Sequence, residues 1–214
     1  MLNNILRYLF FMLVVNPMVL IVIGLNVRRR QLLPKSGPAV VVANHNSHLD
    51  ALTLMTLFGL RRLKDVHPVA AADYFLRSPT SAWFSTKILG IIPLDRSPKA
   101  RSGDPLAPVC DALDNGKILI LFPEGSRGEP EQLEEFRTGV AHIAKRYPDV
   151  PMTPVFMHGL GKVLPRGEGL LVPFFCDVFV GESFKWTNDR KTFMATLRES
   201  VESLSAECPR PDWD

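Results

Sequence analysis

The residues at positions 44–50 have the composition and spacing of an acid-base site. They read Asn-His-Asn-Ser-His-Leu-Asp and follow directly on the apolar run Ala39–Ala43. An imidazole can take a proton from a hydroxyl near neutral pH, and a carboxylate on its other nitrogen fixes the tautomer and stabilises the imidazolium. We therefore expect His45 to act as a general base that Asp50 orients. The alternative role for Asp50 is to cap the first turn of the next helix.

A second polar cluster lies at positions 122–128, which read Phe-Pro-Glu-Gly-Ser-Arg-Gly and follow the apolar run 118–121. Glycine and proline favour a tight loop, and the planar guanidinium of an arginine matches the geometry of a phosphate. We expect Glu124, Gly125, Ser126 and Arg127 to bind a phosphorylated substrate. The alternative is a surface turn that carries an ion pair.

Two shorter segments add to these clusters. Residues 90–96 read Gly-Ile-Ile-Pro-Leu-Asp-Arg, a short strand that leads to Arg96. Residues 150–155 read Val-Pro-Met-Thr-Pro-Val, an apolar strand interrupted by prolines, which we expect to pack beneath the site. Neither segment would indicate a function alone.

The elements that must position these residues alternate between strand and helix. We expect strands at 39–43, 66–71, 91–94, 117–122, 152–157 and within 170–179, and helices at 49–60, 79–89, 106–113, 134–147 and 188–206. Strands that alternate with helices predict an α/β fold with a mixed, largely parallel sheet flanked by helices. We expect residues 31–214 to form this catalytic domain.

The N-terminal segment differs from the rest of the chain. From Leu9 to Val27 it is apolar and uncharged, close to the roughly 20 residues that span a hydrocarbon core. Arg28, Arg29 and Arg30 follow it, which predicts a cytoplasmic side by the positive-inside rule and allows contact with anionic headgroups. We expect residues 1–30 to be a membrane anchor.

The sequence is compatible with more than one form of membrane anchor. Pro17 interrupts the apolar run, so the alternatives are a single span and a kinked helix pair that lies in one leaflet. A cleaved signal peptide fits less well, because no small-x-small site precedes the arginines.

Composition narrows the classes of partner. The 25 Lys and Arg residues against 22 Asp and Glu residues give a net charge of only +3, which does not indicate a nucleic-acid partner. The three cysteines, at 110, 176 and 208, lack the spacing of metal ligands or a disulfide framework. We expect neither a metal nor a cofactor.

Taken in order, residues 45–50, 90–96, 122–127 and 150–155 resemble the four motifs of the glycerolipid acyltransferase family, in particular of bacterial 1-acylglycerol-3-phosphate acyltransferases. The order and spacing agree over roughly residues 38–160, most of the expected catalytic domain.

This resemblance implies acyl transfer from acyl-CoA or acyl carrier protein to the free hydroxyl of a lysophospholipid, above all 1-acylglycerol 3-phosphate, giving phosphatidate. It implies that His45 and Asp50 are catalytic and that Arg127, Glu124 and Arg96 hold the phosphate. It also implies a membrane phospholipid partner, a bacterial-type inner membrane location and a catalytic domain that faces the cytoplasm.

Two departures from the family leave the acceptor open. Residues 69–75 read Val-Ala-Ala-Ala-Asp-Tyr-Phe where many such enzymes carry a lysine-rich stretch, and Glu129 and Glu131 add negative charge after the phosphate loop. Lysophosphatidylglycerol or an aminolipid is therefore an alternative acceptor. Less favoured alternatives are a hydrolase, which lacks a Gly-x-Ser-x-Gly elbow around Ser47 or Ser126, and an inactive scaffold.

Overall fold

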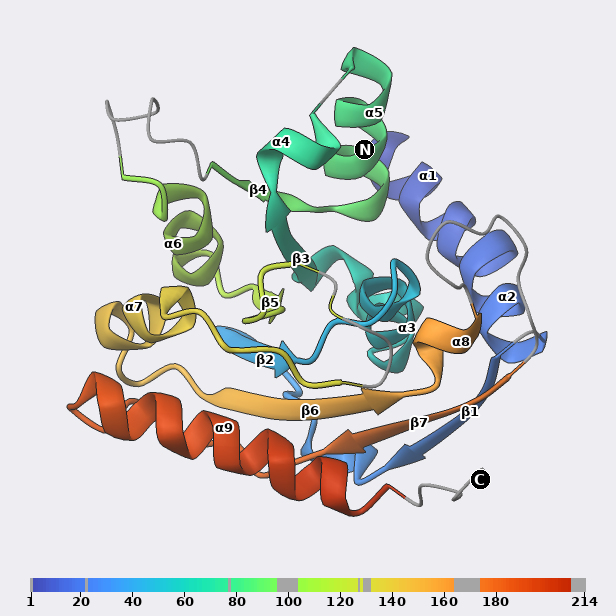
Figure 1. The fold of residues 1–214 in the computed structure, drawn as a ribbon. Helices are drawn as coiled ribbons and strands as arrows, with labels where there is room; N and C mark the ends of the chain where they lie inside the picture. The colour runs from blue at the N-terminus through green and yellow to red at the C-terminus, as the bar shows by residue number, and fades with distance from the viewer. Residues whose placement is uncertain are drawn as a thin grey trace.

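The computed structural model describes residues 2–21, 23–76, 78–95, 104–126, 128, 132–163 and 174–208. Its centre is a seven-stranded sheet in the order β1-β7-β6-β2-β5-β3-β4 (Figure 1). Neighbouring strands are parallel except for β6 and β7, which are antiparallel. The predicted mixed, largely parallel sheet is therefore confirmed.

The strands of this sheet are β1 (Ile23–Arg28), β2 (Ala39–Ala43), β3 (Val66–Ala71), β4 (Ile92–Leu94), β5 (Ile118–Leu121), β6 (Met152–His158) and β7 (Phe174–Val180). The α-helices are α1 (Leu2–Phe10), α2 (Asn16–Ile21), α3 (Leu49–Leu57), α4 (Ala72–Phe75), α5 (Pro79–Trp83), α6 (Ala107–Asp114), α7 (Gly139–Arg146), α8 (Leu160–Val163) and α9 (Arg190–Ala206). Two π-helical segments, η1 (Phe11–Val15) and η4 (Phe84–Leu89), continue α1 and α5, and the 3-10 segments are η2 (Arg30–Leu32) and η3 (Leu60–Asp65).

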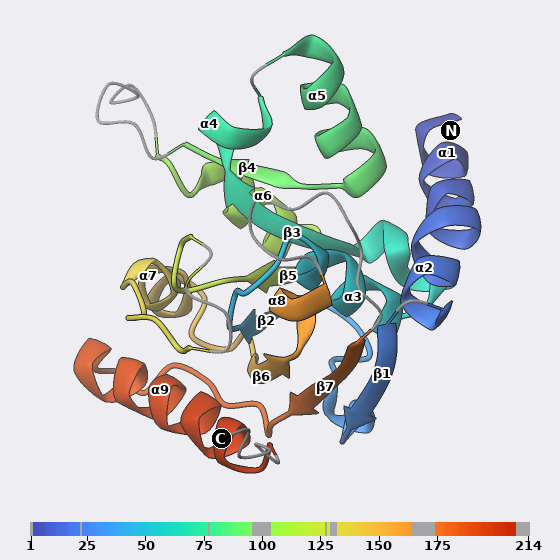
Figure 2. The same ribbon diagram turned by 45° about the vertical axis from the view of Figure 1, so that its right-hand side comes forward.

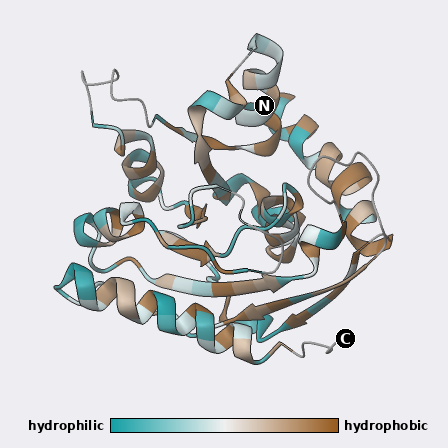
Figure 3. Ribbon diagram, viewed as in Figure 1, coloured by the Kyte–Doolittle hydropathy of each residue, from teal (hydrophilic) through white to brown (hydrophobic). Residues whose placement is uncertain are grey.

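Helices cover both faces of the sheet, and β2 shows how. Val41 contributes to the core that includes residues of α2 and α3, whereas Val40 and Val42 contribute to the core under α6, α7 and α9. Alternate side chains of a strand point to opposite faces, so an all-apolar strand is the pattern of a sheet buried on both sides. Figure 3 shows the sheet in hydrophobic colours beneath α9, whose surface alternates between hydrophobic and hydrophilic.

The N-terminal helix packs along the edge of the domain. Residues Leu2–Ile21 form one helical run of 20 residues that is long and apolar enough to cross a membrane. However, Phe11, Val15 and Val19 are buried in the same core as the sheet. Figure 2 shows α1 and α2 lying beside the domain, with α2 leading into β1. One side of this helix is therefore part of the folded domain.

We expected the apolar segment from Leu9 to Val27 to be helical throughout, and this is wrong for its last residues. Ile23–Arg28 instead forms β1, the edge strand that pairs with β7. Ile23, Leu25 and Val27 alternate with Gly24, Asn26 and Arg28, which is the period of a strand. The sheet therefore begins before residue 31, where we expected the catalytic domain to start. The anchoring role of the segment before it stays a prediction.

The three arginines after the apolar segment contact the protein. Arg29 donates hydrogen bonds to the carbonyl of Val180 and to both carboxylate oxygens of Glu207, and Arg30 donates to the carbonyl of Leu57. The five steps from Ile23 to Arg28, at about 3.3 Å each, place Arg28 roughly 16 Å beyond the start of β1. The folded domain therefore holds these arginines, and the membrane orientation that they predict stays a prediction.

A second correction concerns the helix expected at 134–147, which begins only at Gly139 as α7. The peptide N–H of Arg137 donates to the carbonyl of Pro123 at 2.8 Å, and its side chain donates to the carbonyl of Glu124 at 3.1 Å. Contacts with the loop after β5 therefore hold this segment in an extended path. The other predicted elements of the described residues are present within a few residues of their expected bounds, with 170–173 lying outside those residues.

Candidate active site

His45 and Asp50 are brought together at the carboxyl end of β2. His45 follows that strand, Asp50 lies in the first turn of α3, and His45 Nδ1 is 2.9 Å from Asp50 Oδ2. The Asp50 side chain is fully buried, whereas that of His45 keeps 20% of its surface exposed. A carboxylate on Nδ1 leaves Nε2 as the nitrogen that can accept a proton. The expected pairing is thus present in the structure.

Asp50 also holds the loop that carries His45. Its Oδ2 accepts hydrogen bonds from the peptide N–H groups of Asn46 at 2.6 Å and Ser47 at 2.8 Å. The same carboxylate therefore organises the turn and orients the imidazole. Asp50 does not cap the first turn of the next helix, the alternative that the sequence left open, because the N–H groups it accepts from belong to the loop before α3.

Asn44 fixes the point at which the chain leaves the sheet. Its side-chain amide donates to the carbonyl of Met157 at 2.8 Å and accepts from the Met157 N–H at 2.7 Å. The amide thus continues the pairing of β2 with β6 after the β2 backbone has turned away. His45, the next residue, is therefore held at a defined place on the rim of the sheet.

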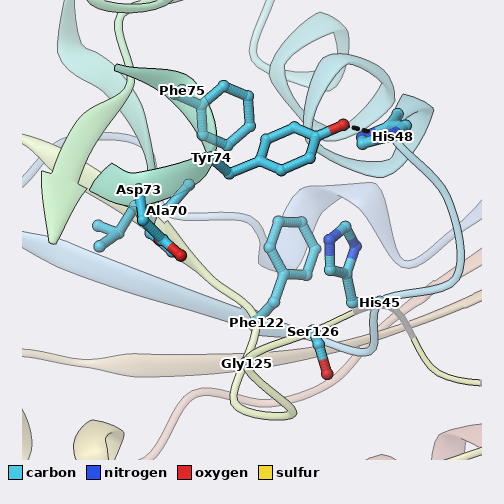
Figure 4. A pocket seen from close by; sticks show the side chains of 11 residues that line it. His45, His48, Ala70, Asp73, Tyr74, Phe75, Phe122, Gly125 and Ser126 are labelled. Carbon is cyan, nitrogen blue, oxygen red and sulfur yellow. Dashed lines mark hydrogen bonds between the residues drawn. The ribbon is translucent and has the colours of Figure 1, made fainter. Parts of the chain in front are cut away.

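The His45 ring stacks on Phe122 and faces a pocket. The ring centroids lie 4.2 Å apart with planes 21° from parallel, and the pocket beside them has a volume of about 340 Å³. Figure 4 shows Tyr74 and Phe75 on the side opposite Phe122 and His45, with Gly125 and Ser126 at the base. Residues that follow β2, β3 and β5 therefore meet at one end of the sheet, where ligands of α/β proteins bind. The pocket is lined by His45, His48, Val69, Ala70, Ala71, Asp73, Tyr74, Phe75, Phe122, Gly125 and Ser126.

Glu124 is buried beneath this pocket. Its side chain is only 3% exposed, and neither carboxylate oxygen has a hydrogen-bond partner among the residues that the structure describes. Burial raises the pKa of the Glu124 carboxyl to about 7; the nearby peptide group of His45 opposes this shift, and the charge of Asp50 adds to it. Glu124 therefore changes its protonation state near neutral pH.

The loop after β5 is tied to both the base and the segment before α7. The Gly128 N–H donates to the carbonyl of His45 at 3.2 Å. A Cβ at Gly125 would lie 2.9 Å from Cδ and Nε of Arg137, so glycine allows the Arg137 side chain to cross the loop. The Arg137 side chain therefore packs against this loop.

The two predicted phosphate-binding arginines, Arg96 and Arg127, lie outside the described residues. Gly125 and Ser126 line the pocket, and Glu124 lies beneath it. Sequence reasoning assigned no role to Tyr74, Phe122 or Asn44 in the site. Only Asn44 carried a local signal, an amide directly after a buried strand.

Within the described ranges, no group of three or more His, Cys, Asp or Glu side chains is placed to hold a metal ion. In this part of the chain, the titratable side chains that line the pocket are His45, His48, Asp73 and Tyr74.

The sheet is largely parallel, and at its carboxyl edge a carboxylate orients a histidine beside a glycine-containing loop. This combination of fold and site is that of the glycerolipid acyltransferase class. A sequence model of the family described as "Acyltransferase" matches residues 24–158, more than half of the chain. The chain belongs to this acyltransferase family.

Individual relatives agree with this assignment. The chain is 32% identical over 149 residues to the chloroplastic 1-acyl-sn-glycerol-3-phosphate acyltransferase LPAT1 of Arabidopsis thaliana, an alignment covering 69% of this chain and 40% of the relative. It is 31% identical to the 1-acyl-sn-glycerol-3-phosphate acyltransferase alpha of Ovis aries, over 63% of this chain and 45% of the relative. The chain thus spans less than half the length of these curated relatives.

The fold resembles that of a solved structure. The 1-acyl-sn-glycerophosphate (LPA) acyltransferase PlsC from Thermotoga maritima superposes with a TM-score of 0.69 over 97% of this chain and 81% of that chain. At 22% sequence identity, this likeness establishes the fold.

Proposed function

We propose that the protein transfers an acyl group from acyl-CoA or acyl carrier protein to the free hydroxyl of 1-acylglycerol 3-phosphate, giving phosphatidate. The observation that carries this proposal is the 2.9 Å contact of His45 Nδ1 with buried Asp50, beside a pocket that the His45 ring lines. The printed activity of the relatives from Arabidopsis thaliana and Ovis aries supports the choice of acceptor.

The chemistry proceeds in one transfer. Nε2 of His45 takes the proton of the acceptor hydroxyl, whose oxygen attacks the thioester carbonyl carbon. The carbonyl π electrons move to oxygen and return as the carbon–sulfur bond breaks, and the departing thiolate takes the proton from the imidazolium. Asp50 stabilises the imidazolium that exists between these two proton transfers. We propose no metal and no cofactor for this reaction.

The acceptor phosphate is assigned to the loop after β5. We assign its binding to Arg127, Arg96, Ser126 and Gly125, because arginine forks and loop N–H groups suit phosphate oxygens. Glu124 beneath the loop has a pKa of about 7, and its neutral form repels a phosphate less than a carboxylate would.

A membrane-bound position follows from the exposed apolar side chains. Leu2, Ile5, Leu9 and Leu13 of the N-terminal helix are between 38% and 67% exposed, while the opposite side of the helix is buried in the domain. We assign this helix to the surface layer of a membrane, lying in one leaflet, because a crossing helix would have to leave that core. A bacterial-type inner membrane, with the domain on its cytoplasmic face, remains part of this proposal.

A second acceptor class is favoured by the charge of the pocket. Within the described part of the chain, its lining includes Asp73 and contains neither lysine nor arginine. An acidic wall suits an acceptor that carries a cation, such as a lysolipid with an amino headgroup.

An acceptor panel separates these proposals. Purified full-length protein would be assayed in mixed micelles with labelled acyl-CoA or acyl carrier protein and with lysophosphatidate, lysophosphatidylglycerol or lysophosphatidylethanolamine. The proposal expects the highest kcat/KM with lysophosphatidate. If lysophosphatidate is the poorest acceptor, the assignment of phosphatidate as product is wrong. Release of free fatty acid at one rate with and without any acceptor would instead identify a hydrolase.

A further inference from the structure

The pocket carries a second polar pair on the side opposite Phe122. The hydroxyl of Tyr74 is 3.2 Å from Nε2 of His48, and the two rings stack with centroids 5.6 Å apart. Both residues line the pocket that His45 lines. Figure 4 shows the Tyr74 hydroxyl directed toward His48, with the His45 ring between that hydroxyl and Ser126.

The fold brings this pair together from two separate segments. Tyr74 lies on α4, directly after β3, whereas His48 lies in the loop between β2 and α3. The strand β5, which leads to the Glu124 loop, separates β2 from β3 in the sheet. In Figure 4, Gly125 and Ser126 of the loop after β5 lie on one side of the His45 ring, and the Tyr74–His48 pair lies on the other.

We propose that Tyr74 is a further catalytic residue, an inference that rests on the proposed acyl transfer. Its phenolic hydroxyl donates a hydrogen bond to the thioester oxygen as negative charge develops there, and His48 orients the hydroxyl. The acceptor oxygen forms its bond to the carbonyl carbon, and the π electrons move onto the oxygen that Tyr74 faces. Tyr74 keeps its proton throughout. When the carbon–sulfur bond breaks, the electrons return and the hydrogen bond weakens.

The hydrogen count of the pair defines the tautomer that this role requires. A phenol has a single hydrogen, so Tyr74 can donate to the substrate only if it accepts from His48. His48 must therefore carry its hydrogen on Nε2 and donate it to the phenol oxygen. A donor that itself accepts a hydrogen bond is polarised, which strengthens the bond it makes to the substrate.

Charge places the thioester, rather than the phosphate, against this pair. A phenol and an imidazole are uncharged donors, which suit an oxygen that is charged only in the transition state. Asp73 is the residue before Tyr74 and lines the same pocket, so a permanently anionic phosphate would meet a carboxylate there. The phosphate is better matched by the loop on the other side of His45.

The exposure of the pair sets the expected size of its effect. Tyr74 is 43% exposed, so its donor works at full strength only when bound substrate displaces water. Removal of one buried oxyanion-hole donor slows kcat about 10²–10³-fold. For this half-exposed donor we expect a loss of about 10- to 100-fold in kcat.

The test compares Tyr74→Phe with Tyr147→Phe, a control because the Tyr147 hydroxyl is also hydrogen-bonded, at 2.9 Å to Asp114 Oδ1, and Tyr147 does not line the pocket. The full-length protein is assayed with acyl-CoA and lysophosphatidate in mixed micelles. We expect Tyr74→Phe to lower kcat by about 10- to 100-fold with both KM values within about 2-fold of wild type, and Tyr147→Phe to change neither. An S-alkyl-CoA thioether, which lacks the carbonyl, should bind the wild type and Tyr74→Phe equally.

Substitutions at His48 test the orienting role. Glutamine can still donate an N–H to the phenol oxygen and alanine cannot, so His48→Gln should retain more of kcat than His48→Ala. Because the two residues act as one unit, the double variant His48→Ala with Tyr74→Phe should be no slower than Tyr74→Phe alone.

Four outcomes would overturn the proposal. Unchanged kcat in Tyr74→Phe removes its catalytic role, and a raised KM for lysophosphatidate at constant kcat assigns the pair to the acceptor headgroup. Weaker binding of the thioether by Tyr74→Phe shows packing against the donor instead. A wild-type protein that neither acylates any lysophospholipid nor hydrolyses acyl-CoA overturns the proposed function and this role together, whereas an active wild type isolates the question at Tyr74.

Discussion

Asp50 performs its role through one oxygen atom. Oδ2 lies within 2.9 Å of His45 Nδ1 and of the peptide nitrogens of Asn46 and Ser47, while Oδ1 has no hydrogen-bond partner in the described part of the chain. The carboxylate thus joins the conformation of the loop to the tautomer of the base, and the two roles can be separated by substitution.

The variant Asp50→Asn separates them. The asparagine oxygen can still accept from the loop N–H groups, but it stabilises the imidazolium less and permits the wrong tautomer. We expect Tm to fall by only a few degrees and kcat to fall by about 10³-fold or more. Thermal unfolding and steady-state kinetics measure the two effects. A kcat within 10-fold of wild type would show that Asp50 serves the loop alone.

Glu124 gives a pH-dependent prediction for stability. Its pKa rises from 4.5 to about 7 on folding, so the folded state holds the proton more tightly than the unfolded state. Its contribution is therefore most favourable below pH 4.5 and is lost as pH rises through 7. Glu124→Gln removes this titration, because glutamine has the same charge at every pH.

The free energy of unfolding of Glu124→Gln, minus that of wild type, should increase by about 2–3 kcal/mol when the pH is raised from 5 to 8.5. Chemical denaturation at the two pH values measures this relative gain, and the constant cost of burying an amide cancels in the difference. An equal effect of the substitution at both pH values would show that Glu124 does not titrate in this range.

At the scale of elements, Arg7 links the N-terminal helix to the start of β4. Its Nη2 donates a hydrogen bond to the carbonyl of Val66 at 2.8 Å. Its guanidinium packs so closely on Gly90 that a Cβ there would lie only 2.5 Å from it. Phe10 and Phe84 also meet edge to face, with centroids 5.3 Å apart. The helix α1 is thus fixed to the same turn from which β4 leads toward Arg96.

Gly90 and Gly116 form a matched pair for testing this link. Each follows a helical segment with positive φ, +71° and +67°, but the nearest neighbour of a Cβ at Gly116 would be the carbonyl oxygen of Gly37, at 4.0 Å. Alanine at Gly116 costs about 1 kcal/mol of backbone strain, and alanine at Gly90 adds the displacement of Arg7. We expect Gly90→Ala to be the more destabilising by about 1–2 kcal/mol, a difference that shrinks in an Arg7→Ala background. Equal unfolding free energies for the two variants would mean that Arg7 moves aside freely.

The elements also show what the sequence could predict. Buried strands such as β2 and β3 carry continuous apolar runs between turn residues, and their predicted bounds agree with the structure. β1 was hidden inside a longer apolar segment, and the start of α7 depended on hydrogen bonds from Arg137 to a loop twelve or more residues away. Local patterns therefore gave most of the fold, while contacts between distant segments decided the rest.

The same distinction, between local sequence patterns and contacts of distant segments, applies to the site. His45 and Asp50 are five residues apart, so a single turn brings them together and spacing alone could indicate it. Tyr74 and His48 are 26 residues apart on different elements, and only the packing of α4 over the loop after β2 makes them a pair.

At the scale of the whole molecule, exposed apolar side chains gather on few elements. Among the described residues, the large exposed hydrophobic side chains fall into three groups. The first lies on the N-terminal helical run of α1, η1 and α2. The second lies on α4, the residue after it, α5 and η4, and the third is the first two residues of β7. Such clustering marks an interaction surface for lipid or protein. The pocket that holds His45 is bordered by α4, which belongs to the same set.

Vesicle flotation tests the assignment to lipid. The double variant Leu9→Ser with Leu13→Ser should bind phosphatidylglycerol vesicles at least about 10-fold more weakly than wild type, because each lost leucine contact contributes more than 1 kcal/mol. The control is Ala195→Ser with Ala206→Ser, two exposed positions on α9. Equal binding by wild type and the leucine variant would exclude the N-terminal helix as the lipid contact.

The central claim is that His45 is the base of an acyl transfer, and labelled acyl transfer to lysophosphatidate by His45→Ala tests it most directly. His142→Ala is the matched control, since His142 is an exposed histidine on α7. We predict a loss of at least about 10³-fold in kcat for His45→Ala with an unchanged Tm, and wild-type rates for His142→Ala. Phosphatidate formation by His45→Ala at the wild-type rate would show that His45 is not the base.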